Sequence, residues 1–171
     1  MIKYILIAVM LLSSFIFAEY TRFTRLDSGI VVDHEYGLQW QDDINYTDEW
    51  IGAIDYCENL GLGGENDWRM PNINELLFII ETNSSEPTMN SIYKNVLLDN
   101  QTEVSADDIR GCGTGGDFYW SSTSSDANNS KAIGVRFNLG MTYQDPKKKY
   151  TRGTTTKEQN CSVRCVRSDF D

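Results

Sequence analysis

The stretch GENDWRMPNINELLF, residues 64–78, decides how the rest of the chain is interpreted. Pro71 disfavours helical geometry in the residue before it, so a helix is expected to begin after this proline. Asn72 fits the N-cap position, and Glu75, three residues later, completes a capping box. The apolar residues 76–80 would form the body of the helix. We therefore expect Asn72 and Glu75 to serve folding rather than ligand binding.

The stretch before it, residues 45–64, predicts an amphipathic helix. Thr47 fits its N-cap, and Asp48 and Glu49 suit the positive end of the helix dipole. Gly61 is placed to end the helix. Four apolar residues recur at spacings of four and three, which puts them on one inward face: Trp50, Ile54, Cys57 and Leu60.

The remaining segments have strand and loop character. GIVVDHEYGLQWQDD (29–43) predicts a hairpin with His34 in a solvated turn. Residues 82–117 are polar and acidic and predict long irregular loops. Strands are expected from residue 118, over 131–140 and over 161–167, with a polar excursion at 146–160. A hairpin, two helices and a later antiparallel set predict an α+β fold.

The N-terminus and the charge limit the possible functions. Residues 1–18 combine Lys3 with an apolar run too short for a membrane span of about 20 residues, which predicts a secretory signal peptide. We expect residues 19–171 to be a single domain, exported to the periplasm or outside the cell, that does not span the membrane. The chain carries a net charge of −10, and removal of Lys3 makes it more negative. Nucleic acid is therefore not expected as a partner, because phosphate binding needs a positive surface.

The four cysteines predict two disulfides, because an even count in an oxidising compartment is typical of a disulfide framework. The count alone leaves three pairings open. A zinc site is disfavoured, since only Cys161 and Cys165 lie close in the sequence and His34 is remote.

Five blocks together resemble the Legionella collagen-like protein C-terminal domain family: GLQWQDD, AIDYCENLGLGGENDWRMPNINEL, FYWSSTS, AIGVRFNLG and VRCVR. The resemblance runs from about residue 29 to residue 167, and part of it is also similar to sulfatase-modifying and formylglycine-generating proteins. Both groups imply a C-type-lectin-like fold, with two helices packed on a small antiparallel sheet and long irregular loops. Within it, Trp68, Arg69 and Pro71 would seat the second helix. The lectin-like fold also favours the disulfides Cys57–Cys165 and Cys112–Cys161.

Catalytic and metal-binding patterns are weak. His34 has no evident catalytic partners. Formylglycine-generating enzymes use a reactive pair of cysteines, but every cysteine of this chain has a plausible structural partner, so such a reactive pair has no support here. Residues 41–49 and 105–110 bring hard oxygen ligands together, so calcium is the one cofactor they would suit. Neither stretch matches a known calcium loop, and solvated acidic loops are the favoured interpretation. We therefore expect no catalytic residue, no metal site and no cofactor.

A basic stretch stands out in this acidic chain, and we treat it as the candidate ligand site, with a flexible solvated loop as the alternative interpretation. Its side chains would pair with sulfate or carboxylate groups, while two tyrosines offer flat faces for sugar rings. The candidate ligand-binding residues are Tyr143, Lys147, Lys148, Lys149, Tyr150 and Arg152, with Lys157 adding to the local charge.

These patterns favour an exported, non-catalytic binding or adhesion module for an acidic polysaccharide or a surface protein. Weak binding would become useful when several copies act together, so a homo-oligomer is compatible with this function. Two alternatives remain open: a sulfatase-modifying-like or glycan-cleaving enzyme, and a structural envelope subunit that binds only proteins.

Overall fold

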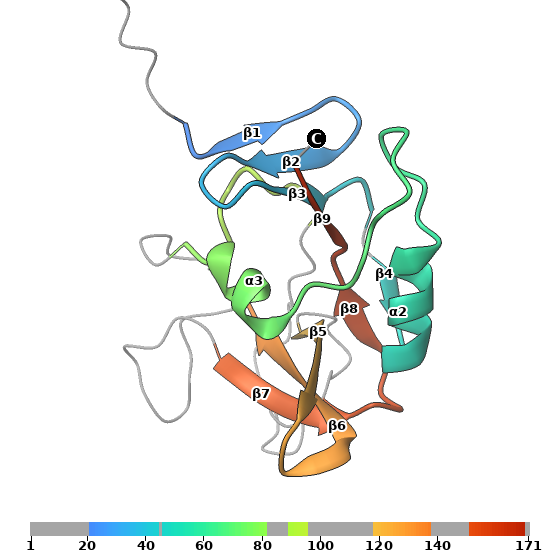
Figure 1. Ribbon diagram of the computed structural model, residues 1–171. Helices are drawn as coiled ribbons and strands as arrows, with labels where there is room; N and C mark the ends of the chain where they lie inside the picture. The colour runs from blue at the N-terminus through green and yellow to red at the C-terminus, as the bar shows by residue number, and fades with distance from the viewer. Residues whose placement is uncertain (1–20, 45, 82–88, 96–117, 138–150, 170–171) are drawn as a thin grey trace, which may run out of the picture.

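The computed structural model describes residues 21–44, 46–81, 89–95, 118–137 and 151–169 (Figure 1). These residues form two β-sheets with two short helices beside them. The four-stranded sheet has the order β1 (Phe23–Arg25), β2 (Ile30–Asp33), β3 (Leu38–Gln41), β9 (Val166–Ser168). The five-stranded sheet has the order β4 (Tyr46–Asp48), β8 (Cys161–Val163), β5 (Phe118–Ser125), β6 (Asn128–Arg136), β7 (Thr151–Thr156). The helices are α2 (Trp50–Glu58) and α3 (Ile73–Phe78).

The predicted hairpin at residues 29–43 is confirmed. Strands β2 and β3 pair antiparallel, with Val31 opposite Trp40. The carboxylate of Asp33 accepts hydrogen bonds from the backbone N–H groups of Glu35 and Tyr36, which shapes the turn between the strands. His34 is exposed in that turn, as expected, and its ring nitrogen bonds the Thr24 hydroxyl at 2.9 Å.

The prediction of a C-type-lectin-like α+β fold, with two helices packed on a small sheet, is wrong. Sheets dominate the described residues, and the helices have only nine and six residues. Residues expected at the start of the first helix form β4 instead, which pairs with β8. Glu49 occupies the N-cap of α2, without a side-chain cap bond. Thr47 lies in strand β4, so its predicted capping role is also wrong.

The polar excursion at 146–160 also contains an unpredicted strand. Thr151–Thr156 forms β7, which pairs antiparallel with β6 along six residues. Threonine is β-branched and fits a pleated strand, so a run of threonines pairs readily once a partner strand is at its side.

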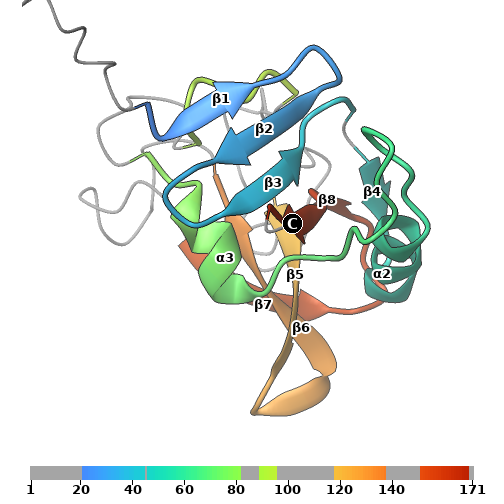
Figure 2. The same ribbon diagram turned by 45° about the horizontal axis from the view of Figure 1, so that its top comes forward.

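The closing stretch, residues 161–167, divides between the two sheets. Strand β8 joins the five-stranded sheet and β9 joins the four-stranded sheet. Arg164 and Cys165 lie between them, and both are buried. The chain therefore passes from one sheet to the other at these two residues. Figures 1 and 2 show the four-stranded sheet at one end of the molecule and the β5–β6 hairpin projecting at the opposite end.

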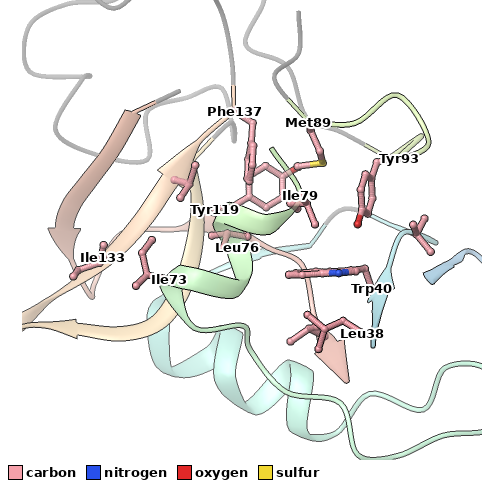
Figure 3. Close-up of a cluster of buried hydrophobic side chains, with 13 residues drawn as sticks. Leu38, Trp40, Ile73, Leu76, Ile79, Met89, Tyr93, Tyr119, Ile133 and Phe137 are labelled. Carbon is pink, nitrogen blue, oxygen red and sulfur yellow. The ribbon is translucent and has the colours of Figure 1, made fainter. Parts of the chain in front are cut away.

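Two apolar clusters fill the interior. One lies beside α2 and includes Trp68, Trp120 and the disulfide cysteines. The other lies beside α3, where Leu76 and Ile79 pack among residues of both sheets (Figure 3). Among the described residues, no helix has the length and apolar character needed to cross a membrane.

Candidate functional site

The N-terminus of α3 is built as the sequence predicts. The Asn72 side chain accepts hydrogen bonds from the backbone N–H groups of Asn74 and Glu75, and Glu75 accepts from the Asn72 N–H at 2.8 Å. Arg69 donates to both Glu75 carboxylate oxygens, at 2.8 and 2.6 Å. Burial alone would raise the pKa of Glu75, but the bonds from Arg69 and the Asn72 N–H outweigh burial and hold that pKa below its usual value. The Asn72 side chain and the Glu75 carboxylate therefore both have structural partners.

Trp68 and Pro71 connect this helix start to the sheets. Trp68 is buried and donates its indole N–H to the Leu62 carbonyl at 3.1 Å. The Pro71 carbonyl accepts from the N–H of Ser122, which lies on β5. The backbone of Arg69 exchanges two hydrogen bonds with Val166 on β9. These contacts fix α3 against both sheets.

One of the two predicted disulfides is confirmed. Cys57 on α2 is bonded to Cys165 between β8 and β9. Cys161 is also disulfide-bonded. Its predicted partner, Cys112, lies outside the described residues, so the second pairing stays a prediction.

The first acidic stretch considered for calcium contains a buried ion-pair centre around Asp42. Asp42 is fully buried and accepts from Arg164 at 2.5 Å and from Arg25. The backbone N–H groups of Lys94 and Asn95 also donate to its carboxylate, at 2.8 and 3.1 Å. Asp42 therefore ties the segment 89–95 to β3 and to the point where the chain changes sheets.

The other acids of that stretch have partners of their own. Asp43 accepts from the Gln41 amide at 2.9 Å, and Asp48 accepts from the Tyr46 hydroxyl at 2.9 Å. In the described part of the chain, no cluster of three or more histidine, cysteine, aspartate or glutamate side chains could hold a metal ion. The second stretch considered for calcium, residues 105–110, lies outside the described residues.

Of the six candidate ligand-binding residues, the structure describes Arg152. This residue is exposed on β7, which forms one edge of the five-stranded sheet. The exposed Thr154 follows two residues later, so both side chains leave the same face. Tyr143, Lys147, Lys148, Lys149 and Tyr150 lie outside the described residues.

Sequence reasoning missed Lys131 as a neighbour of this surface. Lys131 lies opposite Thr156 across the β6–β7 pair, and Arg152 lies opposite Val135. Because positions that differ by an even number share one face, Lys131, Thr154 and Arg152 follow the same face of the sheet. Their alignment follows from the pairing of β6 with β7, two strands that lie on either side of residues 138–150 in the sequence. No local sequence pattern reveals this pairing.

Lys157, which the sequence analysis counted with the basic stretch, holds two parts of the fold together. Its ammonium lies 3.8 Å from the centre of the Trp50 ring and donates to the Ser124 hydroxyl at 2.9 Å. Its carbonyl accepts from the Trp50 N–H at 2.9 Å, at the first turn of α2. Lys157 thus fixes the end of β7 against α2.

Charge is divided unevenly along the chain. Residues 118–160 contain seven lysines and arginines and three acidic residues, a net charge of +4. Residues 19–117 contain twenty acidic residues and five lysines and arginines, a net charge of −15. The described parts of the basic segment form β5, β6 and β7, and the β5–β6 hairpin lies at the end of the molecule opposite the four-stranded sheet (Figure 1).

Comparison with known proteins adds a family. No curated protein matches the chain. The Lcl C-terminal domain family matches residues 29–167, which is most of the chain and includes every strand except β1 and part of β9. The chain therefore belongs to the Legionella collagen-like protein C-terminal domain family.

Proposed function

We propose that this protein is an exported, non-catalytic binding module that recognises an acidic polysaccharide through β7 and the basic residues around it. Family membership supports a surface-binding role. The uneven distribution of charge supports the ligand class, because a net charge of +4 gathers over residues 118–160 of an otherwise acidic chain. This charge distribution is the observation that carries the proposal.

Strand β7 offers suitable chemistry for such a ligand. Arg152 presents a guanidinium that pairs with two oxygens of a sulfate or carboxylate at once. Thr154 adds a hydroxyl, and Lys131 adds a second cation along the same face. An extended polysaccharide carries its anions at intervals, so a row of donors along a strand suits it better than a closed cleft. Lys147, Lys148 and Lys149 come shortly before β7 in the sequence and would add positive charge for the same ligand.

The acidic remainder of the chain does not prevent this binding. Salt screens charges beyond about 8 Å at physiological ionic strength, so a ligand on β7 responds mainly to the charges near it. The same screening keeps each exposed contact weak, at about 0.2–1 kcal/mol. Useful attachment would then need several copies on one polymer.

The test measures binding of the exported protein to heparin and to neutral dextran at low and high salt. Heparin should bind at low salt and be released at high salt, and dextran should not bind. Replacing Lys147, Lys148 and Lys149 together by Ser should remove most of the heparin binding. Arg152→Ser and Lys131→Ser should each weaken it by about two- to fivefold, the range expected for an exposed ion pair.

Lys94→Ser is the matched control. It removes the same charge as Lys131→Ser from an exposed lysine of the acidic segment, and the backbone N–H that Lys94 donates to Asp42 is unaffected. Heparin affinity should not change. Binding that ignores salt and all the β7 variants would contradict the proposal, as would an equal loss for Lys94→Ser and Lys131→Ser.

A further inference from the structure

The tip of the β5–β6 hairpin carries a modification sequence outside the proposed binding residues. Residues 126–130 read DANNS, so Asn128 is followed two positions later by Ser130 and preceded two positions earlier by Asp126. Asn-x-Ser is the acceptor sequence of N-linked glycosylation in exported proteins, where it marks a surface segment. The bacterial enzymes that attach such glycans also read an acidic residue two positions before the asparagine.

The structure exposes this whole sequence. Strands β5 and β6 pair as far as Ser125 and Asn128, and the two residues between them form the turn. Residues 126–130 are all exposed, and the hairpin projects from the body of the molecule in both views (Figures 1 and 2). An enzyme can therefore reach Asn128 and both of the residues that it must recognise beside it.

The hairpin tip is held loosely to the rest of the fold. Strand β7 pairs with β6 from Lys131 onwards, and the Lys157 N–H donates to the Ser130 carbonyl at 3.0 Å. Asn128 lies beyond this pairing and is matched with Ser125 across the hairpin. The end of a hairpin opens locally at low cost. The chain around Asn128 can therefore enter the cleft of an enzyme while the protein stays folded.

The amide group of Asn128 is oriented by Ser130. Asn128 Oδ1 accepts from the Ser130 N–H at 2.9 Å and from the Ser130 hydroxyl at 2.8 Å. A backbone N–H can only donate, so the atom that it meets must be the carbonyl oxygen of the side chain. Among the described residues, no group bonds the amide nitrogen of Asn128. This nitrogen is the atom that would be modified, so a glycan there would displace no hydrogen bond of the fold.

A second copy of the pattern, EQNCS at residues 158–162, is blocked by the fold. Asn160 is exposed, but Ser162 is fully buried on β8, and Cys161 is buried and disulfide-bonded. Strand β8 lies between β4 and β5, so an enzyme could contact Ser162 only if β8 left the sheet. The two patterns are equivalent in the sequence and differ in the folded protein. Two further copies, at Asn45 and Asn83, have their asparagines outside the described residues.

We propose that Asn128 is the acceptor of an N-linked glycan, added after export by an enzyme that transfers an oligosaccharide from a lipid pyrophosphate carrier. The Asn128 amide nitrogen forms a bond to C1 of the first sugar and loses one proton. The bond between that C1 and the pyrophosphate breaks, and the lipid pyrophosphate leaves. The proposal rests on export, which is part of the proposed function, and not on polysaccharide binding at β7.

The first experiment offers the folded chain, with its disulfides intact, to a purified bacterial oligosaccharyltransferase and its lipid-pyrophosphate-linked oligosaccharide. Trypsin places the two sites in separate peptides, residues 111–131 and 158–164, which mass spectrometry distinguishes. Asn128 should be glycosylated and Asn160 should stay bare, whereas both should be glycosylated in the reduced and unfolded chain. A bare Asn128 in the folded chain, or equal glycosylation of both sites there, overturns the proposal.

Two variants at exposed positions of the hairpin tip test recognition. Asp126→Asn removes the acidic charge at nearly constant size and should remove most of the glycosylation of Asn128. Asn129→Gln, at the position between Asn128 and Ser130 that the enzyme does not read, is the matched control and should leave it unchanged. Melting temperatures show that both variants fold. Equal effects of the two variants overturn the proposal.

The same peptide map is then made for the protein collected from outside the cytoplasm of the cells that produce it. Asn128 should carry the glycan. An exported chain with a bare Asn128 overturns this proposal and leaves heparin binding at β7 untouched. A chain that stays in the cytoplasm overturns export, on which both proposals depend.

Discussion

Asp42 shows how a single residue joins distant parts of this chain. Its buried carboxylate meets two arginines and two backbone N–H groups, so all of its charge is compensated inside the protein. A buried ion pair of this kind contributes little net stability compared with apolar residues of the same size, but removing one partner leaves an uncompensated charge. Asp42 is therefore more sensitive to substitution than an exposed aspartate.

Asp42→Asn should lower the free energy of unfolding by about 3–5 kcal/mol, because Arg164 then stays buried without its carboxylate. Urea denaturation of the two proteins measures the difference. Asp55→Asn, at an exposed position of α2, is the control and should change stability by less than about 0.5 kcal/mol. A loss at Asp42 no larger than at Asp55 would mean that the ion-pair centre is not formed in solution.

Glu75 provides a pH-dependent prediction at the same scale. Its folded-state pKa lies below the reference value of 4.5, so its stabilising effect is fully present above pH 4.5 and is lost as the pH falls through the folded-state value. The half-exposed Arg69 limits the effect to about 0.5–1 kcal/mol. Glu75→Gln should thus be less stable than the wild type at neutral pH, and the difference should shrink below pH 4.5. Thermal unfolding at several pH values follows it, and a difference that stays constant throughout would refute this account.

At the scale of elements, the β6–β7 pair contains a pair of glycines with unequal surroundings. Gly134 and Gly153 lie opposite each other. A Cβ on Gly134 would collide with the Tyr119 carbonyl and the Phe118 ring, whereas a Cβ on Gly153 would lie at an ordinary 3.4 Å from that ring. Strand β6 therefore requires glycine at this position, where it pairs with β5, whereas β7 does not require glycine at the opposite position.

Gly134→Ala should destabilise the protein by about 1–3 kcal/mol, because the added methyl group overpacks a close contact. Gly153→Ala should lie within about 0.5 kcal/mol of the wild type or be slightly more stable, since alanine restricts the unfolded chain. Comparing the melting temperatures of the two variants checks the pair. Similar losses of stability for both variants would show that glycine is needed at any position of this strand pair, and that the close contact at Gly134 is not the cause.

The sequence was most informative about elements specified by their own residues. Helix α3 was predicted because Asn72, Glu75 and the preceding Pro71 are local signals. Strand β7 was missed because its threonines form a strand only beside β6. The stretch 161–167 looked like one strand, and it divides because Arg164 and Cys165 are held by Asp42 and Cys57, both more than 100 residues away. Long-range bonds of this kind leave no local pattern.

For the whole molecule, the sequence motifs identified the family but not the architecture. The blocks around Trp68 and Pro71 report how one helix is seated, which fits more than one arrangement of sheets. The candidate site was likewise predictable only where its residues are close together in the sequence. The basic stretch was visible as a run of lysines, whereas Lys131 joins it only through strand register.

The bond between Cys57 and Cys165 has a mechanical consequence. The two cysteines are 108 residues apart in the sequence, and β5, β6 and β7 all lie between them. If the chain is stretched from its two ends, the pulling force passes through the sulfur–sulfur bond and bypasses this whole loop. Arg152 and Thr154 lie within the bypassed loop, so the strand proposed to hold the polysaccharide is not drawn out along its own backbone. In a protein held at a surface under flow, the strand proposed to bind the ligand would thus not carry the pulling force.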